Sequence, residues 1–260
     1  MEATGKQGPV QVEELEGGAY WRVLLNRPKG NILDGQMFEG LTAVFRRVAE
    51  TADLKVICLE GRGSHFSYGA SVREHLPEQV ERMLGGFHGM LQTMFDSSCV
   101  VLAAVRGQCL GGGLELVSCC HRVFASGNAR LGQPEIVLGV FPPVASVILP
   151  ERVGRGPAED LCLSGRILEA GEALEIGLID VVAEDPSQAA LAYAKEHLLP
   201  HSASSLRCAV KAARQGLRTR FLAELREVER IYLQELMATG DAVEGLRAFM
   251  EKRSPEWKNA

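Results

Sequence analysis

The stretch Arg106-Gly107-Gln108-Cys109-Leu110-Gly111-Gly112-Gly113-Leu114-Glu115-Leu116 follows Val100 to Val105, an apolar run typical of a buried strand. Three consecutive glycines where a strand becomes a helix let a ligand approach the backbone, and they leave the first N–H groups of the helix pointing outward. The motif predicts a receptor for an anion or an oxyanion. A tight turn that only packs a helix against a strand can have the same glycines. The neighbouring segments must therefore distinguish a ligand-binding turn from a structural one.

Two glutamates flank this turn in apolar surroundings. Glu115 lies in the first turn of the predicted helix, where the helix dipole favours ionisation and burial opposes it. Glu135 is the only charge between Arg130 and Glu151, and uncompensated burial of a charge is costly. Glu115 could instead be a structural helix-start residue, and Glu135 could turn to solvent. Together they form a candidate acid/base pair.

A third segment, His65-Phe66-Ser67-Tyr68-Gly69-Ala70-Ser71, follows the strand-like run Val56 to Leu59. Its small residues would let main-chain N–H groups face a ligand and supply the second donor of an oxyanion hole. His65 could act as a base, but a histidine at a strand end is more often a packing or hydrogen-bonding residue, and we favour that interpretation.

The rest of the chain predicts an α/β fold with a helical tail. Strand-like runs alternate with helical stretches, which argues for crossover connections. We expect a core over residues 1–199 and a helical region over residues 200–260, which would cover either its own core or a neighbouring subunit. The predicted elements are a hairpin (Val10 to Leu15 and Tyr20 to Leu25), a helix capped by Asp34, strands at Val123 to Ala125 and Ile179 to Val182, and tail helices at Ser202 to Gln215, Arg218 to Ala238 and Asp241 to Lys252.

Composition narrows the function classes. The chain has 260 residues, is 46% hydrophobic and has a formal charge of -5, so it can bury a large core and lacks the basic stripe that nucleic acid or an anionic membrane would select. The seven cysteines are scattered, with no CxxC and no metal-ligand spacing, and therefore predict reduced thiols in the cytoplasm. The segment MEATGKQGPV does not look like an export signal, and no apolar run is long enough to span a membrane.

The three segments, in this order and spacing, resemble the crotonase (enoyl-CoA hydratase/isomerase) superfamily over nearly the whole chain. The resemblance implies a β-β-α spiral core with a C-terminal helical trimerisation region, in a homotrimer or homohexamer. It implies that Tyr68 and Gly112 give backbone N–H groups to a thioester oxygen, and that Glu115 and Glu135 are the catalytic glutamates. Hydratases of the superfamily usually keep both glutamates. No metal or other cofactor is implied.

A narrower resemblance concerns the combinations RPKGNILD, HFSYGASVREHLP and GQPEIVLGVFPPVAS, which are similar to cyclohexa-1,5-diene-1-carbonyl-CoA hydratases of anaerobic benzoyl-CoA degradation. Ser71 stands where related loops carry Asp, and Phe141-Pro142-Pro143 replaces a glycine-rich turn. Such bulky, stiff residues would shape the pocket for a ring, unless the loop has simply drifted. The alternatives are a general enoyl-CoA hydratase, a ring-opening hydrolase or isomerase, and a non-catalytic acyl-CoA- or RNA-binding relative.

Binding of an acyl-CoA requires local positive charge, because the protein as a whole is acidic. The resemblance makes Lys29 the best candidate, since the corresponding loop borders the nucleotide. Each basic residue near the N-terminal loops or the C-terminus is individually more often a solvated surface charge, and the C-terminal pair Lys252 and Arg253 could act from an adjacent subunit. The full set of expected substrate- or CoA-binding residues is Lys29, Arg27, Ala70, Gly111, Phe141 and Lys252, with Arg62 and Arg253 as further basic candidates.

Overall fold

The central sheet follows the chain almost in sequence order. The computed structural model describes residues 8–260, and within that range the strand order is β1-β2-β3-β4-β6-β9. β1 and β2 are antiparallel, whereas the other neighbouring pairs are parallel, as crossover connections require. The strands are Val10–Leu15 (β1), Tyr20–Leu25 (β2), Val56–Gly61 (β3), Val100–Val105 (β4), Arg122–Ala125 (β6) and Val181–Val182 (β9).

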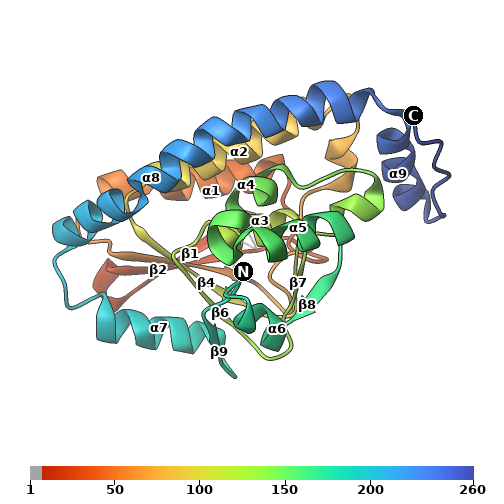
Figure 1. Ribbon diagram of the computed structural model, residues 1–260. Coiled ribbons are helices and arrows are strands. Elements are labelled where there is room, and N and C mark those ends of the chain that lie inside the picture. The colour runs from red at the N-terminus through yellow and green to blue at the C-terminus, as the bar shows by residue number, and fades with distance from the viewer. Residues whose placement is uncertain (1–7) are drawn as a thin grey trace, which may run out of the picture.

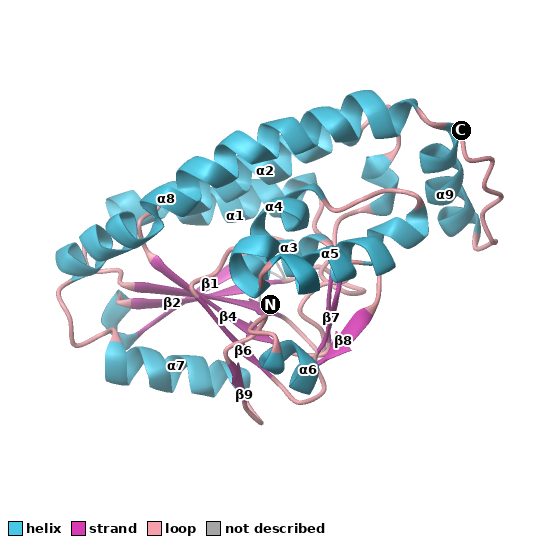
Figure 2. Cartoon of the chain, in the orientation of Figure 1, coloured by secondary structure: helices cyan, strands magenta, loops and turns pink. Residues whose placement is uncertain are grey.

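Helices cover both faces of this sheet (Figure 1 and Figure 2), with α1, α2 and α8 on one side and α7 on the other. All residues of β4 are consequently buried, which explains its continuous apolar sequence. The predicted α/β architecture is confirmed. The helices are Gly35–Arg47 (α1), Val80–Asp96 (α2), Gly112–Ser118 (α3), Pro143–Val153 (α4), Arg155–Ser164 (α5), Ala170–Glu175 (α6), Pro186–His197 (α7), Ala203–Arg230 (α8) and Gly240–Glu251 (α9).

The elements with strong local signals form as predicted. The N-terminal hairpin has the expected bounds and pairs Val10 with Leu25. The Asp34 side chain accepts a hydrogen bond from the Met37 N–H at 3.0 Å and caps α1. The predicted strand at 179–182 is shorter than expected, because its pairing with β6 begins only at Val181.

A small second sheet, β5-β7-β8, was not predicted. It is decisive for the site because β5 (Gln108–Leu110) ends at the glycine turn and β7 (Arg130–Gly132) leads into the segment of Glu135. β8 (Ile167–Glu169) completes the sheet on the far side of β7. The parallel pairing of β5 with β7, followed by a hydrogen bond from the Gly111 N–H to the Gly132 carbonyl (2.9 Å), brings the two segments side by side.

The helical tail differs from the prediction. A single helix, α8, runs through Gly216 where we expected a break, because packing along α2 and α4 outweighs the roughly 1 kcal/mol cost of an internal glycine. After α8 the chain forms a π-helical turn at Ile231–Glu235 and a 3-10 turn at Leu236–Ala238. In the described chain the tail covers its own core: α8 lies along α2 (Figure 1), and α9 packs near the short helices that follow β3 and β7.

The structure also bears on the cysteines and on membrane-spanning helices. All seven cysteines lie within the described residues and none is in a disulfide. None of the helices between residues 8 and 260 is long and apolar enough to cross a bilayer. Residues 1–7, which make up most of the segment MEATGKQGPV, lie outside the described residues.

Candidate active site

A cavity of about 70 Å³ lies where the three sequence segments meet. It is bordered by the loop Tyr68–Ala70, the glycines of the turn, both glutamates and the Phe141-Pro142-Pro143 loop. The structure thus brings together segments that are far apart in the sequence, as predicted. The small sheet and the two bridges Leu33–Ala70 and Ser67–Cys109 hold these segments in register.

Glu115 is buried in the first turn of α3, with 4% of its surface exposed. Its Oε1 accepts a hydrogen bond from the Ala145 N–H at 2.8 Å, and Ala145 belongs to the first turn of α4. The partial positive charge of that helix end favours the ionised form. Burial acts in the opposite direction and is stronger, so the pKa of Glu115 is raised to about 7.

Glu135 reaches the same cavity from a 3-10 turn, η4 (Pro134–Leu138). The residue is half-buried because the turn itself is partly exposed, but its carboxyl faces Gly111. The fully buried Gln133 side-chain amide, with its nitrogen toward the carboxylate, donates to Oε2 and Oε1 of Glu135 at 3.1 and 3.2 Å. Burial, and then the negative charge of Glu115, raise the pKa of Glu135 well above its ordinary value.

These two carboxyls therefore titrate as a pair that keeps a proton at higher pH than free glutamates do. When one is protonated and the other ionised, the cavity holds an acid and a base side by side. The pair can take a proton from one reacting atom and return one to another. Between residues 8 and 260 no cluster of side chains is arranged to hold a metal ion.

The raised pKa of Glu115 predicts how folding stability depends on pH. The folded protein binds this proton more tightly than the unfolded chain does, so its stabilising effect is full below pH about 4.5 and is lost as pH rises towards about 7. Relative to Glu115→Gln, the wild type should lose unfolding free energy across that window in urea titrations. The exposed Glu78→Gln controls for the loss of one charge, and parallel wild-type and Glu115→Gln curves would contradict the prediction.

The geometry corrects one predicted oxyanion donor. The Tyr68 N–H donates to the Gly30 carbonyl at 2.9 Å and is not free to bind a ligand. The Ala70 N–H has no hydrogen-bond partner within residues 8–260, and its nitrogen lies 3.2 Å from where a Cβ on Gly112 would be. The Gly112 N–H, at the start of α3, is likewise unpaired in that range. Ala70 and Gly112 are therefore the two donors that face the cavity together.

The side chains of His65 and Tyr68 make packing and hydrogen-bonding contacts near the cavity. His65 accepts a hydrogen bond from the Gln108 N–H at 3.1 Å, which supports the packing and hydrogen-bonding interpretation over that of a base. The ring of Tyr68 packs edge-on against His65 and borders both the cavity and a neighbouring open groove. The groove is also lined by Lys29 and Arg62, so Tyr68 is the residue that the groove and the cavity share.

The basic residues expected to bind CoA are not equally placed. Lys29 lies on the groove beside Tyr68, in a loop where its own φ is +67°. Arg27 also borders that groove, but its guanidinium is paired with Asp34 and bonded to Gln36. Lys252 ends α9 and borders neither the cavity nor the groove.

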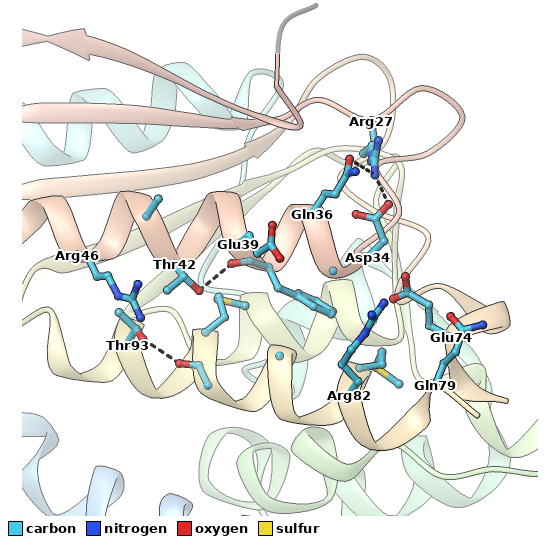
Figure 3. Close-up of a pocket in the computed structure, with 17 residues that line it drawn as sticks. Arg27, Asp34, Gln36, Glu39, Thr42, Arg46, Glu74, Gln79, Arg82 and Thr93 are labelled. Carbon is cyan, nitrogen blue, oxygen red and sulfur yellow. Dashed lines mark hydrogen bonds and ion pairs between the residues drawn. The ribbon is translucent and has the colours of Figure 1, made fainter. Parts of the chain in front are cut away.

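A larger depression of about 700 Å³ lies elsewhere, between α1 and α2, and contains neither glutamate of the pair (Figure 3). Many of its polar groups are already satisfied: the hydroxyls of Thr42 and Thr93 bond the backbone of their own helices, and Arg27 pairs with Asp34. The depression is a groove between charged helices, and its size does not make it the candidate site.

Sequence reasoning missed one wall of the cavity. Val72 and His75 of the 3-10 turn η3 (Val72–His75), together with Met83, Leu84 and Phe87 of α2, also line this cavity. His75 Nδ1 lies 2.9 Å from the Ser71 carbonyl, which can only accept, and burial lowers the pKa of the imidazole. The apolar side chains of α2 have the spacing of any core-facing helix, which gives no signal that they also border a cavity.

Helix α9 packs against both η3 and η4, the two short helices that contribute residues to the cavity. A Cβ on Gly245 would lie 2.2 Å from the carbonyl oxygen of Leu138, the last residue of the turn that carries Glu135. We expect Gly245→Ala to destabilise the fold by about 1–3 kcal/mol and to lower activity by displacing Glu135. Thermal unfolding and steady-state rates would measure the two effects.

Gly85→Ala in α2 is the matched control, because a Cβ there has no neighbour within 4 Å. It should stabilise α2 by about 1 kcal/mol or less and leave activity unchanged. A Gly245→Ala protein as stable and active as this control would show that α9 does not constrain the turn.

Comparisons with known proteins identify the family of this chain. Residues 18–260 match the Enoyl-CoA hydratase/isomerase family. The chain is 49% identical over 251 residues to a cyclohexa-1,5-dienecarbonyl-CoA hydratase from Thauera aromatica, covering 96% of this chain and 97% of that protein. It is 35% identical to a probable enoyl-CoA hydratase from Rhizobium meliloti, with 93% and 95% covered.

Among solved structures, an enoyl-CoA hydratase/isomerase from Pseudoalteromonas atlantica superposes with a TM-score of 0.84 at 26% identity, covering 96% of this chain and 99% of that one. A second similar fold is an enoyl-CoA hydratase from Mycobacterium avium, with a TM-score of 0.84 at 24% identity, covering 96% of this chain and 98% of that one. From the family match and the high identity of its relatives, this chain belongs to the enoyl-CoA hydratase/isomerase family.

Proposed function

We propose that this protein is an acyl-CoA hydro-lyase that adds water to cyclohexa-1,5-diene-1-carbonyl-CoA and forms 6-hydroxycyclohex-1-ene-1-carbonyl-CoA. The observation that carries the proposal is the pair of carboxyls, Glu115 and Glu135, in one cavity with two backbone N–H groups that have no partner among residues 8–260. The Thauera aromatica relative, at 49% identity, supports the choice of substrate. The reaction would belong to anaerobic degradation of aromatic compounds.

The oxyanion donors act on the thioester carbonyl. When water attacks the β-carbon, negative charge develops on the carbonyl oxygen as an enolate, and the Ala70 and Gly112 N–H groups lie where they can meet it. Each preorganised donor contributes about 3 kcal/mol to lowering the barrier. The side chain that glycine lacks at position 112 would otherwise contact Ala70 and fill this space.

The carboxyl pair handles the protons. The ionised carboxylate accepts a proton from water as its oxygen bonds to carbon, and the protonated carboxyl gives its proton to the carbanion carbon. With the cyclic diene, attack at the β-carbon leaves a dienolate, and protonation at its far end leaves one double bond conjugated with the thioester. Atoms balance as one water added. Deuterium recovered only next to the carbonyl would contradict protonation at the far end.

The shape of the cavity supports a ring substrate. Phe141, Pro142 and Pro143 border it, and the fixed φ angles of the two prolines make that loop stiff. Val72, Met83 and Phe87 complete an apolar wall around a volume of about 70 Å³. A flat ring fits a short, rigid, apolar pocket better than a long flexible chain does, because it loses less conformational entropy on binding.

The test is to offer the purified protein cyclohexa-1,5-diene-1-carbonyl-CoA and crotonyl-CoA in parallel, and to compare kcat/KM while water addition is followed by mass. Preference for the diene is the expected result. Preference for crotonyl-CoA would mean a general enoyl-CoA hydratase, and an acid product with free CoA or an opened ring would mean a hydrolase. Binding without turnover would point to a non-catalytic relative.

We also propose that Lys29 binds the phosphates of CoA and that the protein works as a trimer, or a pair of trimers, in the cytoplasm. The groove at Lys29 opens beside the acyl cavity, and the unpaired thiols fit a reducing compartment. Exposed apolar side chains near η4, including Val137, Leu163 and Ile167, supply a surface that a second copy would cover. Light scattering of the purified protein tests the assembly, and a monomer would contradict it.

A further inference from the structure

The ring of Tyr68 takes no part in the proton transfers or in the oxyanion hole, yet it stands at a particular place. The residue borders both the acyl cavity and the open groove at Lys29, and between residues 8 and 260 no other residue borders the two together. With 45% of its surface exposed, the side chain is open to a ligand. Its position therefore calls for a role in binding.

Neighbouring groups hold this exposed ring in place. The Tyr68 N–H donates to the Gly30 carbonyl at 2.9 Å. The ring lies so close to Gly30 that a Cβ there would be 2.2 Å from the ring atom Cδ2, and it meets the His65 ring edge-on, with 5.0 Å between centroids. Because these contacts restrict the ring before a ligand arrives, little conformational entropy is lost when the ligand packs on it.

An acyl-CoA has to occupy the cavity and the groove at once. Its acyl group belongs beside Glu115 and Glu135, and its phosphates belong beside Lys29. An uncharged arm of methylene and amide groups joins the two ends. Since Tyr68 is the residue common to the cavity and the groove, the arm reaches from one to the other past its ring. An aromatic ring offers such an arm a large apolar contact area with a polar tip.

We propose that the Tyr68 ring binds the uncharged arm of the substrate next to the thioester sulfur and so makes the site select thioesters that carry this arm. The arm does not react, and its contact with the ring is the same before and during the reaction. Such a contact lowers KM and leaves kcat unchanged. It is distinct from the role of the Ala70 N–H in the same loop. This inference rests on the proposed function.

The kinetic test compares Tyr68→Ala, which removes the ring, with Tyr68→Phe, which keeps it. We expect KM for the preferred CoA thioester to rise about tenfold in Tyr68→Ala, as for the loss of about 50 Å² of apolar contact. In Tyr68→Phe both constants should stay within about twofold of the wild type. Leu174→Ala in α6 is the matched control, because Leu174 is an apolar side chain exposed to 42% that borders neither the cavity nor the groove.

The split between KM and kcat decides how the ring acts. An unchanged KM in Tyr68→Ala would overturn the inference. If kcat fell instead of KM rising, the ring would act only through the loop that carries the Ala70 N–H, and the inference would again be wrong. An equal loss in Tyr68→Phe and Tyr68→Ala would contradict a contact made by the ring.

A binding test separates this inference from the proposed function. Calorimetry would use butyryl-CoA and butyryl-pantetheine, which are saturated and cannot be hydrated; the second has the arm without the nucleotide. Tyr68→Ala should weaken both about tenfold, whereas Lys29→Ala should weaken only butyryl-CoA. A wild type that does not bind butyryl-pantetheine, or a loss confined to butyryl-CoA in Tyr68→Ala, would overturn the inference. If the wild type hydrates no thioester but Tyr68→Ala weakens both ligands, the proposed function fails and the contact stands.

Discussion

Replacing Glu115 or Glu135 with glutamine is expected to lower kcat for hydration by about 100- to 10,000-fold, the range for removal of one general acid or base. Glutamine keeps the shape of each side chain and can still accept the Ala145 N–H that Glu115 accepts now. It cannot take up or release a proton at neutral pH. The change therefore removes proton transfer and leaves the cavity intact.

Stopped-flow or steady-state assays with the preferred thioester would measure the loss, and circular dichroism would verify the fold. Glu60→Gln is the matched control, because Glu60 is also a buried carboxyl but bonds Ser187 at 2.7 Å, away from the cavity. Its substitution should change stability without changing kcat. If either active-site variant kept more than about a tenth of wild-type activity, that glutamate would not be a general acid or base.

The parts of this site that could be predicted from sequence are those with local signals. The glycine turn and the position of Glu115 in the first turn of α3 follow from a strand, three glycines and a helix start in succession. Glu135 was identified because a charge in an apolar run needs a reason, and its carboxyl does lie in the cavity. The cap at Asp34 needed no information beyond the next few residues.

Features that depend on contacts distant in sequence could not be predicted in this way. Strands of three residues, such as β5 and β7, are too short for a hydrophobic alternation, yet their pairing joins the two catalytic segments. The Tyr68 N–H had to be assigned from a resemblance, and the hydrogen bond to Gly30 that occupies it is visible only in the fold. Nothing in the pattern around Gly216 reveals that packing carries α8 through it.

The closeness of Gly111 to Glu135 suggests a further large effect, that of Gly111→Ala. Gly111 has a φ of +49° and a ψ of -127°, which L-residues rarely adopt, and a Cβ would lie 2.5 Å from the Glu135 Oε1. The substitution therefore combines backbone strain with a steric clash against the Glu135 carboxylate. Backbone strain should cost about 1–2 kcal/mol of stability, and displacement of the carboxylate by about 1 Å should lower kcat about 100-fold.

Gly177→Ala separates these penalties, because Gly177 has a φ of +76° but no atom within 4 Å of the place that a Cβ would take. It should lose stability to a similar degree and keep full activity. Parallel chemical denaturation and kcat measurements on both variants would then assign the activity loss in Gly111→Ala to the carboxylate. If both variants lost activity equally, strain in the backbone would account for the loss, and the contact between position 111 and Glu135 would have no catalytic importance.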